Sequence, residues 1–234
     1  MEFSNSEREE VTTSQDIYDS FNSFIFSNDK KVLSKLIART MLIEKTKDVP
    51  GDILECGVFK GSGVLSFLKI KKILSPNSFK KVVGFDTFDN AELINGLDGI
   101  DKETMSTLFA SRGFSHDAGY VDILEKKIID SGYDKSQFEL IKGDISKTSS
   151  AYVTNRPGAR ISILYLDMDL AKPTYDALCA FWDRISIGGV AVLDEYACHQ
   201  WSEGDGADRF ARERHLTIRS LDYQAPTAYI EKAY

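Results

Sequence analysis

The spacing of apolar residues changes along this chain, and it divides the sequence into two parts. Over roughly the first 50 residues, apolar side chains recur every three or four positions, which predicts helices over 14–26 and 29–47. From residue 52 onward, short continuous apolar runs alternate with segments of helical spacing. The runs predict five strands, at 52–56, 81–86, 137–142, 161–166 and 189–193, and two further strands, at 216–221 and 227–232.

Helices are predicted between these strands, at 62–74, 120–131, 174–185 and 205–214, whereas the polar, glycine-containing stretch 89–119 is predicted to be a long loop with one short helix. Strands that alternate with helices favour a parallel sheet covered on both faces. The last two strands are too close together for a helical crossover, so they should form an antiparallel hairpin. The expected fold class is therefore α/β: a Rossmann-like, doubly wound, mostly parallel seven-stranded sheet with a C-terminal antiparallel hairpin.

We expect residues 1–50 to form a helical segment that precedes the main domain, which should span 51–234. The two predicted helices of this segment carry more apolar residues than one sheet needs to cover. This surplus favours a role as a lid, in substrate contacts or in a homodimer.

Composition narrows the classes of function. The 234 residues carry a formal net charge of −7 with scattered lysine pairs, which argues against a nucleic-acid surface. No apolar run approaches the ~20 residues of a membrane span. The three cysteines, Cys56, Cys179 and Cys198, show neither disulfide nor metal spacing, which is typical of a reducing cytoplasm.

A glycine-rich turn follows the first predicted strand, in the sequence Asp52-Ile-Leu-Glu-Cys-Gly-Val-Phe-Lys-Gly-Ser-Gly63. Gly57 and Gly61 let the backbone bend sharply and approach a ligand closely. The next helix begins near Ser62 and directs free N–H groups toward this turn. The spacing differs from the dinucleotide fingerprint, and the carboxylate of Glu55 would repel a bare phosphate. The turn therefore suits a nucleoside or amino-acid ligand.

Carboxylates mark the ends of the first five predicted strands. They are Glu55, Asp86, Asp144, the pair Asp167 and Asp169, and the pair Asp194 and Glu195. Because the carboxyl ends of parallel strands meet at one edge of a sheet, these residues predict an acidic pocket. Within it, Asp86 is placed to hold the hydroxyls of a ribose, and Asp144 to meet an adenine amino group or the neighbouring loop. Asp167, Asp194 and Glu195 offer oxygen ligands of the kind that Mg²⁺ prefers.

Four motifs resemble those of class I S-adenosylmethionine-dependent methyltransferases, and more narrowly the macrocin O-methyltransferase family. They are Glu55-Cys-Gly-Val-Phe-Lys-Gly61, Gly84-Phe-Asp-Thr-Phe88, Leu166-Asp-Met-Asp-Leu170 and Gly188-Gly-Val-Ala-Val-Leu-Asp-Glu-Tyr196. The resemblance implies a cofactor, S-adenosylmethionine, and a divalent cation such as Mg²⁺. It places Glu55, Gly57, Gly61 and Ser62 at the methionine end of the cofactor, Asp86 and Thr87 at the ribose, Asp144 near the adenine, and Asp169 facing the substrate or the cofactor amino group.

The same resemblance implies that Asp167, Asp194 and Glu195 bind the metal, with Asp167 also counted among the catalytic residues. The family usually has Asp-Asp where this chain has Asp194-Glu195. An alcohol must lose its proton during methyl transfer, so a general base is also expected. His116, in the long loop, is preferred over His199, and His215 is expected to be structural.

The function expected from the sequence is metal-assisted transfer of a methyl group to a hydroxyl of a small molecule, a sugar or another natural-product intermediate. Three alternatives remain open at this point. They are a nicotinamide-dependent oxidoreductase, a hydroxylase on the same scaffold, and a non-catalytic nucleoside-binding module.

Overall fold

A computed structural model describes residues 14–112, 117 and 119–233 of the chain. Seven strands form one sheet: β1 (Asp52–Cys56), β2 (Val82–Asp86), β3 (Phe138–Lys142), β4 (Ile161–Leu166), β5 (Ile185–Leu193), β6 (Arg219–Ser220) and β7 (Ala228–Glu231). Their order is β3-β2-β1-β4-β5-β7-β6. The first five strands are parallel, and β7 runs antiparallel to both β5 and β6. The predicted mostly parallel sheet with a C-terminal antiparallel hairpin is confirmed.

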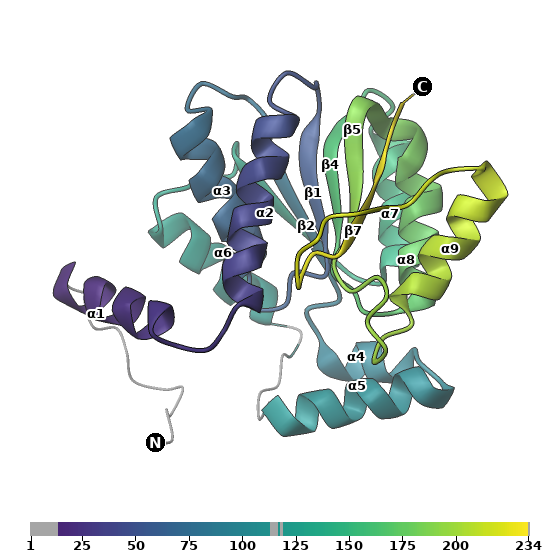
Figure 1. The fold of residues 1–234 in the computed structure, drawn as a ribbon, viewed down its shortest axis with the longest axis horizontal. Coiled ribbons are helices and arrows are strands. Elements are labelled where there is room, and N and C mark those ends of the chain that lie inside the picture. Colours follow the sequence, from purple (N-terminus) through teal and green to yellow (C-terminus); the bar gives the residue numbers. More distant parts are fainter. Residues whose placement is uncertain (1–13, 113–116, 118, 234) are drawn as a thin grey trace.

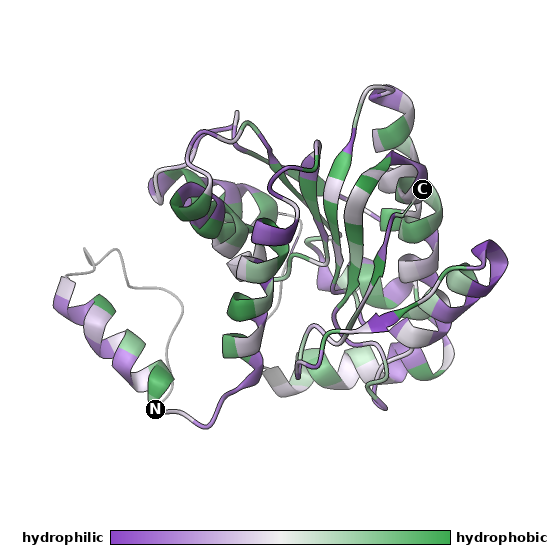
Figure 2. Cartoon of the chain, turned by 45° about the horizontal axis from the view of Figure 1, so that its top comes forward, coloured by the Kyte–Doolittle hydropathy of each residue, from purple (hydrophilic) through white to green (hydrophobic). Residues whose placement is uncertain are grey.

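Helices cover both faces of this sheet (Figure 1). One face carries α2 (Lys31–Lys45), α3 (Ser62–Leu74) and α6 (Tyr120–Asp130), whose apolar side chains pack with Phe67, Tyr165 and Val192 in one core cluster. The other face carries α7 (Ile145–Asn155), α8 (Ala171–Phe181), the 3₁₀ turn η1 (Trp182–Arg184) and α9 (Glu203–Arg214). Figure 2 shows the apolar residues of the strands enclosed between these two helical layers.

The segment 89–119 differs from the predicted loop, because it contains two helices, α4 (Asn90–Asn95) and α5 (Gly99–Arg112). The side chain of Asp89 caps α4 by accepting hydrogen bonds from the N–H groups of Ala91 and Glu92, at 3.0 Å each. Gly96 and Gly99 lie where α4 ends and α5 begins. Glycines that suggest a loop in the sequence therefore mark helix boundaries in the structure.

A second difference is α7, since no helix was expected between β3 and β4. Its sequence, ISKTSSAYVTN, is rich in serine and threonine, which are weak helix formers. Two features stabilise it: the Asp144 side chain accepts a hydrogen bond from the Ser146 N–H at 3.0 Å, and Tyr152 packs against Phe85 and Phe181. Tertiary packing thus overrides the local preference.

The N-terminal helices differ in their attachment. Helix α1 (Ser14–Ile25) buries none of its residues, and Figure 1 shows it lying away from the sheet. Helix α2 buries Ala38, Arg39, Leu42 and Ile43 and packs on α3. None of the helices in the described ranges is both long and apolar enough to cross a bilayer.

Candidate active site

The glycine turn between β1 and α3 has the geometry that its sequence predicts. Gly57 and Gly61 adopt φ angles of 92° and 87°, a region that side chains with a Cβ rarely enter. A Cβ on Gly57 would lie 1.9 Å from the Asp167 carbonyl oxygen, so the turn crosses tightly over the end of β4. A Cβ on Gly63 would lie 1.8 Å from Oε1 of Glu55. These glycines hold the first turn of α3 against the Glu55 carboxylate.

Glu55 is buried beneath this turn, with an exposed fraction of 1%. Its Oε1 lies 3.2 Å from Nη2 of Arg39, while its Oε2 has no hydrogen-bond partner among the described residues. Burial raises the pKa of Glu55 to about 7; Arg39 opposes this shift, and the nearby carboxylates of Asp167 and Asp194 reinforce it. The unpartnered oxygen suits a cationic group of a ligand.

The carboxylates that follow β4 and β5 come together, as predicted. Asp194 is fully buried, and its Oδ1 accepts a hydrogen bond from the Tyr165 hydroxyl at 2.5 Å. Lys35 places its Nζ 2.8 Å from Oδ2 of Asp167 and 2.7 Å from Oδ2 of Asp194. Lys31, on the preceding turn of α2, forms an ion pair with Oε1 of Glu195.

The single positive charge of Lys35 balances only one of the two carboxylates of Asp167 and Asp194. Burial and the charge of Asp167 raise the pKa of Asp194 to about 7. Burial alone would lower the pKa of Lys35, but the attraction of Asp167 and Asp194 is stronger and raises it. Lys35 therefore remains an ammonium ion while the carboxylates share the remaining charge.

Asp169 completes the cluster in an unusual backbone conformation, with φ of 65°. Within the described part of the chain, its carboxyl group accepts no hydrogen bond, unlike Asp167, Asp194 and Glu195. Burial, together with the charges of those three residues, raises the pKa of Asp169 to about 7. Such a carboxyl group can exchange a proton near neutral pH.

Sequence reasoning missed Glu203, a sixth carboxyl group in the same place. It is the first residue of α9, is fully buried, and accepts a hydrogen bond from the Glu195 N–H at 3.0 Å. Burial raises its pKa well above the ordinary value. The sequence analysis also missed the three cations of α2, namely Lys31, Lys35 and Arg39. Their spacing of four residues, on a helix with an apolar stripe, was the available signal.

The remaining predicted cofactor residues lie around the glycine turn and toward β3. Both oxygens of Asp86 are engaged: Oδ2 accepts from the N–H groups of Val58 and Phe59, at 2.8 and 2.9 Å, and Oδ1 from the N–H of Phe88 at 2.8 Å. Asp86 therefore shapes the turn that would receive a ligand. Thr87 donates to the Asp89 carbonyl at 3.2 Å, Ser62 begins α3, and Asp144 caps α7.

The histidine general base expected from the sequence stays a prediction. His116 lies outside the described residues. His199 is exposed on the loop that joins β5 to α9. His215 ends α9 in a left-handed conformation with φ of 54°, in agreement with a structural role.

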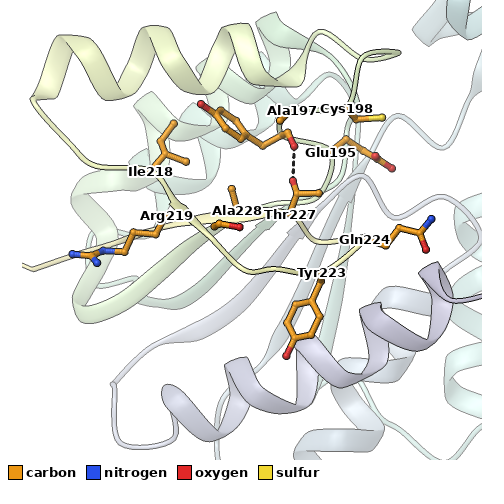
Figure 3. Close-up of a pocket in the computed structure, with 11 residues that line it drawn as sticks. Glu195, Ala197, Cys198, Ile218, Arg219, Tyr223, Gln224, Thr227 and Ala228 are labelled. Atoms are coloured by element: carbon orange, nitrogen blue, oxygen red, sulfur yellow. Dashed lines mark hydrogen bonds between the residues drawn. The ribbon is translucent and has the colours of Figure 1, made fainter.

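A pocket of about 430 Å³ opens beside Glu195, on the side of β5 that faces the C-terminal hairpin (Figure 3). The loop after β5 and the turn before β7 line it, with Tyr196, Arg219, Tyr223, Gln224 and Thr227 among the lining residues. Thr227 fixes the two walls together, because its hydroxyl donates to the Tyr196 carbonyl at 2.7 Å. Aromatic and polar side chains of this kind suit a hydroxylated ligand.

Helix α5 lies near the same edge of the sheet (Figure 1). The Ser202 hydroxyl, in the loop after β5, donates to Oδ1 of Asp101 on α5 at 2.9 Å and accepts from the Ala171 N–H at 2.9 Å. These contacts connect α5 to the ends of β4 and β5.

Comparisons with known proteins agree with this architecture. Residues 28–226 match the family model described as Macrocin-O-methyltransferase (TylF). A relative from Streptomyces olivaceus, 8-demethyl-8-(2,3-dimethoxy-alpha-L-rhamnosyl)-tetracenomycin-C 4'-O-methyltransferase, is 24% identical over 193 residues, which cover 74% of this chain and 70% of the relative.

Two solved structures share the fold. The calicheamicin methyltransferase CalS11 has a TM-score of 0.75 at 22% identity and covers 95% of this chain and 87% of its own. The O-methyltransferase NovP has a TM-score of 0.70 at 17% identity, with 86% and 80% coverage.

Proposed function

The chain belongs to the macrocin O-methyltransferase family and is an S-adenosylmethionine-dependent O-methyltransferase, and from this premise we propose that its acceptor is a sugar hydroxyl of a natural-product intermediate. The observation that carries the proposal is the match to the Streptomyces olivaceus enzyme, whose name gives a methylated rhamnosyl group as its acceptor. Family membership also removes the nicotinamide-dependent oxidoreductase and the non-catalytic module from consideration.

The site fits the cofactor. Gly57 and Gly61 leave room for a close approach, and the buried, unpartnered Oε2 of Glu55 suits the amino group of a methionine moiety. When bound, S-adenosylmethionine supplies an electrophilic methyl group on a positively charged sulfur. Glu55, Gly57, Gly61 and Ser62 would hold its methionine end. Asp86 and Thr87 would support the turn at its ribose, and Asp144 would lie near the adenine.

Asp169 is the best candidate for the general base. The carboxylates of Asp167 and Asp194 are paired with Lys35, and that of Glu195 with Lys31, which leaves Asp169 able to accept the acceptor's hydroxyl proton. Its pKa of about 7 is suited to proton transfer at neutral pH. The pocket beside Glu195 would hold the rest of the sugar and its carrier.

The divalent cation expected from the sequence fits this arrangement poorly. Oδ1 of Asp194 accepts a hydrogen bond from Tyr165, Oδ2 lies in an ion pair with Lys35 but accepts no hydrogen bond among the described residues, and Glu195 is paired with Lys31. Within the ranges that the structure describes, no three histidine, cysteine or acidic side chains are arranged to hold a metal ion. We therefore assign no step to Mg²⁺, and metal assistance stays a prediction that a chelator tests.

We also propose a homodimer, formed through the N-terminal helices. Four large apolar side chains of α1 are 48–64% exposed, namely Ile17, Tyr18, Phe21 and Ile25, and a second group is exposed on α2. Contiguous apolar surface of this kind is typical of an interaction site.

The test of acceptor chemistry is an assay with radiolabelled S-adenosylmethionine. Nucleotide-activated deoxysugars and glycosylated aglycones are compared with a catechol and an amine at equal concentrations. Label is expected on a sugar hydroxyl, which product fragmentation locates. Transfer to the catechol or amine alone would refute the sugar proposal.

A binding measurement accompanies the assay. S-adenosylmethionine should raise the melting temperature, since a ligand at about 100 times its Kd adds about 2.7 kcal/mol to the free energy of unfolding. NAD at the same concentration should leave it unchanged.

A further inference from the structure

Helix α2 presents three cations on one face to the ends of three strands. Lys31, Lys35 and Arg39 follow one another at intervals of four residues, so their side chains project from successive turns in the same direction. Arg39 meets Glu55 at the end of β1, Lys35 meets Asp167 after β4 and Asp194 after β5, and Lys31 meets Glu195. Helix α2 thus supplies positive charge that compensates the negative charge of the acidic cluster.

Lys35 has the most central position of the three. Its Nζ lies within 2.8 Å of carboxylate oxygens from two different strand ends, and its side chain is 19% exposed. Asp194 is fully buried, so its charge requires a close partner. Lys35 and the Tyr165 hydroxyl provide that partner on either side.

An ammonium group has three N–H donors. One donates to Oδ2 of Asp167 at 2.8 Å, while Oδ2 of Asp194 lies 2.7 Å from Nζ in an ion pair without accepting a hydrogen bond among the described residues. A further donor remains for an oxygen atom of a ligand, and the partial exposure of Lys35 leaves it accessible from the cleft. A fixed positive charge next to a hydroxyl oxygen stabilises the negative charge that develops as the proton leaves. These are the tasks that a bound divalent cation performs in metal-assisted alcohol chemistry.

We propose that Lys35 is the resident cation of the acceptor site and that methyl transfer by this enzyme needs no divalent metal. The test has two arms, one that measures metal binding and one that measures activity. Only the activity arm rests on the proposed O-methyl transfer. The bond balance is that of the proposed reaction: an O–C bond forms, the C–S bond of the donor breaks with its electron pair left on sulfur, and the hydroxyl proton passes to Asp169. No further reactant is required.

The binding arm uses protein freed of metal with a chelating resin. Thermal unfolding and titration calorimetry with MgCl₂, MnCl₂ and CaCl₂ should show no stabilisation and no binding by the wild type, because Lys35 holds the carboxylate pair. Lys35→Met removes the charge with little change of volume and exposes Asp167 and Asp194 to solvent cations. The melting temperature of this variant should rise when each salt is added.

Lys45→Met is the matched control for this arm. Lys45 lies on the same helix and pairs with Glu231 at 3.1 Å, away from the acidic cluster. Its variant should respond to the salts as the wild type does. A melting-temperature rise in the wild type with MgCl₂ would overturn the proposal, whether or not an acceptor has been identified.

The activity arm uses the same proteins with S-adenosylmethionine and an acceptor that the assay has shown the wild type to methylate. Excess EDTA should leave wild-type kcat unchanged. Lys35→Met should lower kcat by about 10²-fold or more, the usual cost of losing a preorganised donor to a developing oxyanion. Lys35→Arg, which keeps the charge, should retain more activity than Lys35→Met.

Loss of wild-type activity in EDTA, with recovery on adding Mg²⁺, would contradict the inference, as would full activity of Lys35→Met. Circular dichroism checks that each variant folds, and if Lys35→Met does not, the wild-type measurements and Lys35→Arg still decide. Absence of transfer to every acceptor, together with no metal response of the wild type, would count against the proposed function alone.

Discussion

At the scale of single residues, the site depends on how each carboxyl group is partnered. Asp167, Asp194 and Glu195 are paired with lysines, and Glu55 with an arginine. Asp169 has no such pair in the described ranges, and Glu203 is used to hold the Glu195 N–H. Residues of one chemical type therefore perform different tasks because their neighbours differ.

Replacing Asp169 by asparagine tests the assignment of the base. Asn has the same shape but cannot take up a proton, so kcat should fall by about 10²- to 10⁴-fold while the Kd for S-adenosylmethionine changes little. Steady-state kinetics and calorimetry measure the two quantities.

The control for this change is Asp222→Asn. Asp222 also has a positive φ, of 55°, but lies outside the cluster near the C-terminal hairpin, and asparagine tolerates that conformation. It should leave kcat unchanged, and a wild-type kcat in Asp169→Asn would exclude Asp169 as the base.

Glu55→Gln tests the buried charge through the pH dependence of stability. The folded protein keeps the Glu55 proton up to a pKa of about 7, whereas the unfolded chain releases it near 4.5. The free energy of unfolding of the wild type should therefore fall relative to Glu55→Gln as the pH rises through this window, by about 3 kcal/mol in all, and level off above it.

Urea denaturation of both proteins between pH 4 and 8.5 measures this difference. The groups that face Glu55 are Arg39 and Lys35 on α2, Asp167 after β4 and Asp194 after β5. A difference that stays flat across the range would show that Glu55 has the same pKa in the folded and the unfolded protein, so that burial does not raise it.

At the scale of elements, the sequence predicts some parts well and others poorly. The strand β1, the helix α3 and the strand β4 have the predicted bounds, because their apolar runs are interrupted by unambiguous turn residues. Helix α7 was missed since its stability comes from the Asp144 cap and from the packing of Tyr152. The ion pairs that Lys31 and Lys35 form with the acidic cluster could not be derived from periodicity, because they join residues more than 100 positions apart, as Lys35 and Asp194 show.

The acidic cluster itself was predictable, for a reason of topology. The ends of parallel strands meet at one edge, so Glu55, Asp167 and Asp194 had to approach one another once the strand order was right. The same argument could not tell what neutralises them. The metal ion that the sequence indicated stays a prediction, and in the structure Lys31 and Lys35 form ion pairs with these carboxylates.

The contact between α8 and α9 provides a test at this scale. A Cβ on Gly206 would lie 2.1 Å from the Ala171 carbonyl oxygen, whereas one on Gly204 would meet nothing closer than 3.7 Å. Gly206→Ala should destabilise the protein by about 1–3 kcal/mol through overpacking. Gly204→Ala, on the same helix, should be neutral or stabilising by up to about 1 kcal/mol because alanine favours helix.

Chemical denaturation compares the two variants. Because α9 carries Glu203, which holds the Glu195 N–H, Gly206→Ala should also reduce activity more than Gly204→Ala does. Equal stability of the two variants would show that α9 can shift away from α8 without cost.

At the scale of the whole molecule, the exposed apolar residues of α1 predict self-association. Size-exclusion chromatography with light scattering should give a dimer for the wild type. The double variant Ile17→Glu/Phe21→Glu places two charges on the α1 face and should give a monomer, because burying them would cost several kcal/mol.

Ile73→Glu is the control for this prediction, since Ile73 is 77% exposed on α3 and belongs to neither N-terminal helix. It should leave the dimer intact. A monomeric wild type at micromolar concentration would contradict the homodimer and leave α1 available to cover the cleft instead.

The three cations of α2 have one further consequence, for insertions and deletions. An α-helix turns by about 100° with each residue, so one amino acid inserted between Lys35 and Arg39 would swing Arg39 out of line with Lys31 and Lys35. A substitution of Arg39 removes its charge, whereas this insertion would keep the charge in the protein and turn it away from Glu55. The protein should therefore tolerate an insertion between Lys35 and Arg39 less well than substitutions of most residues between them.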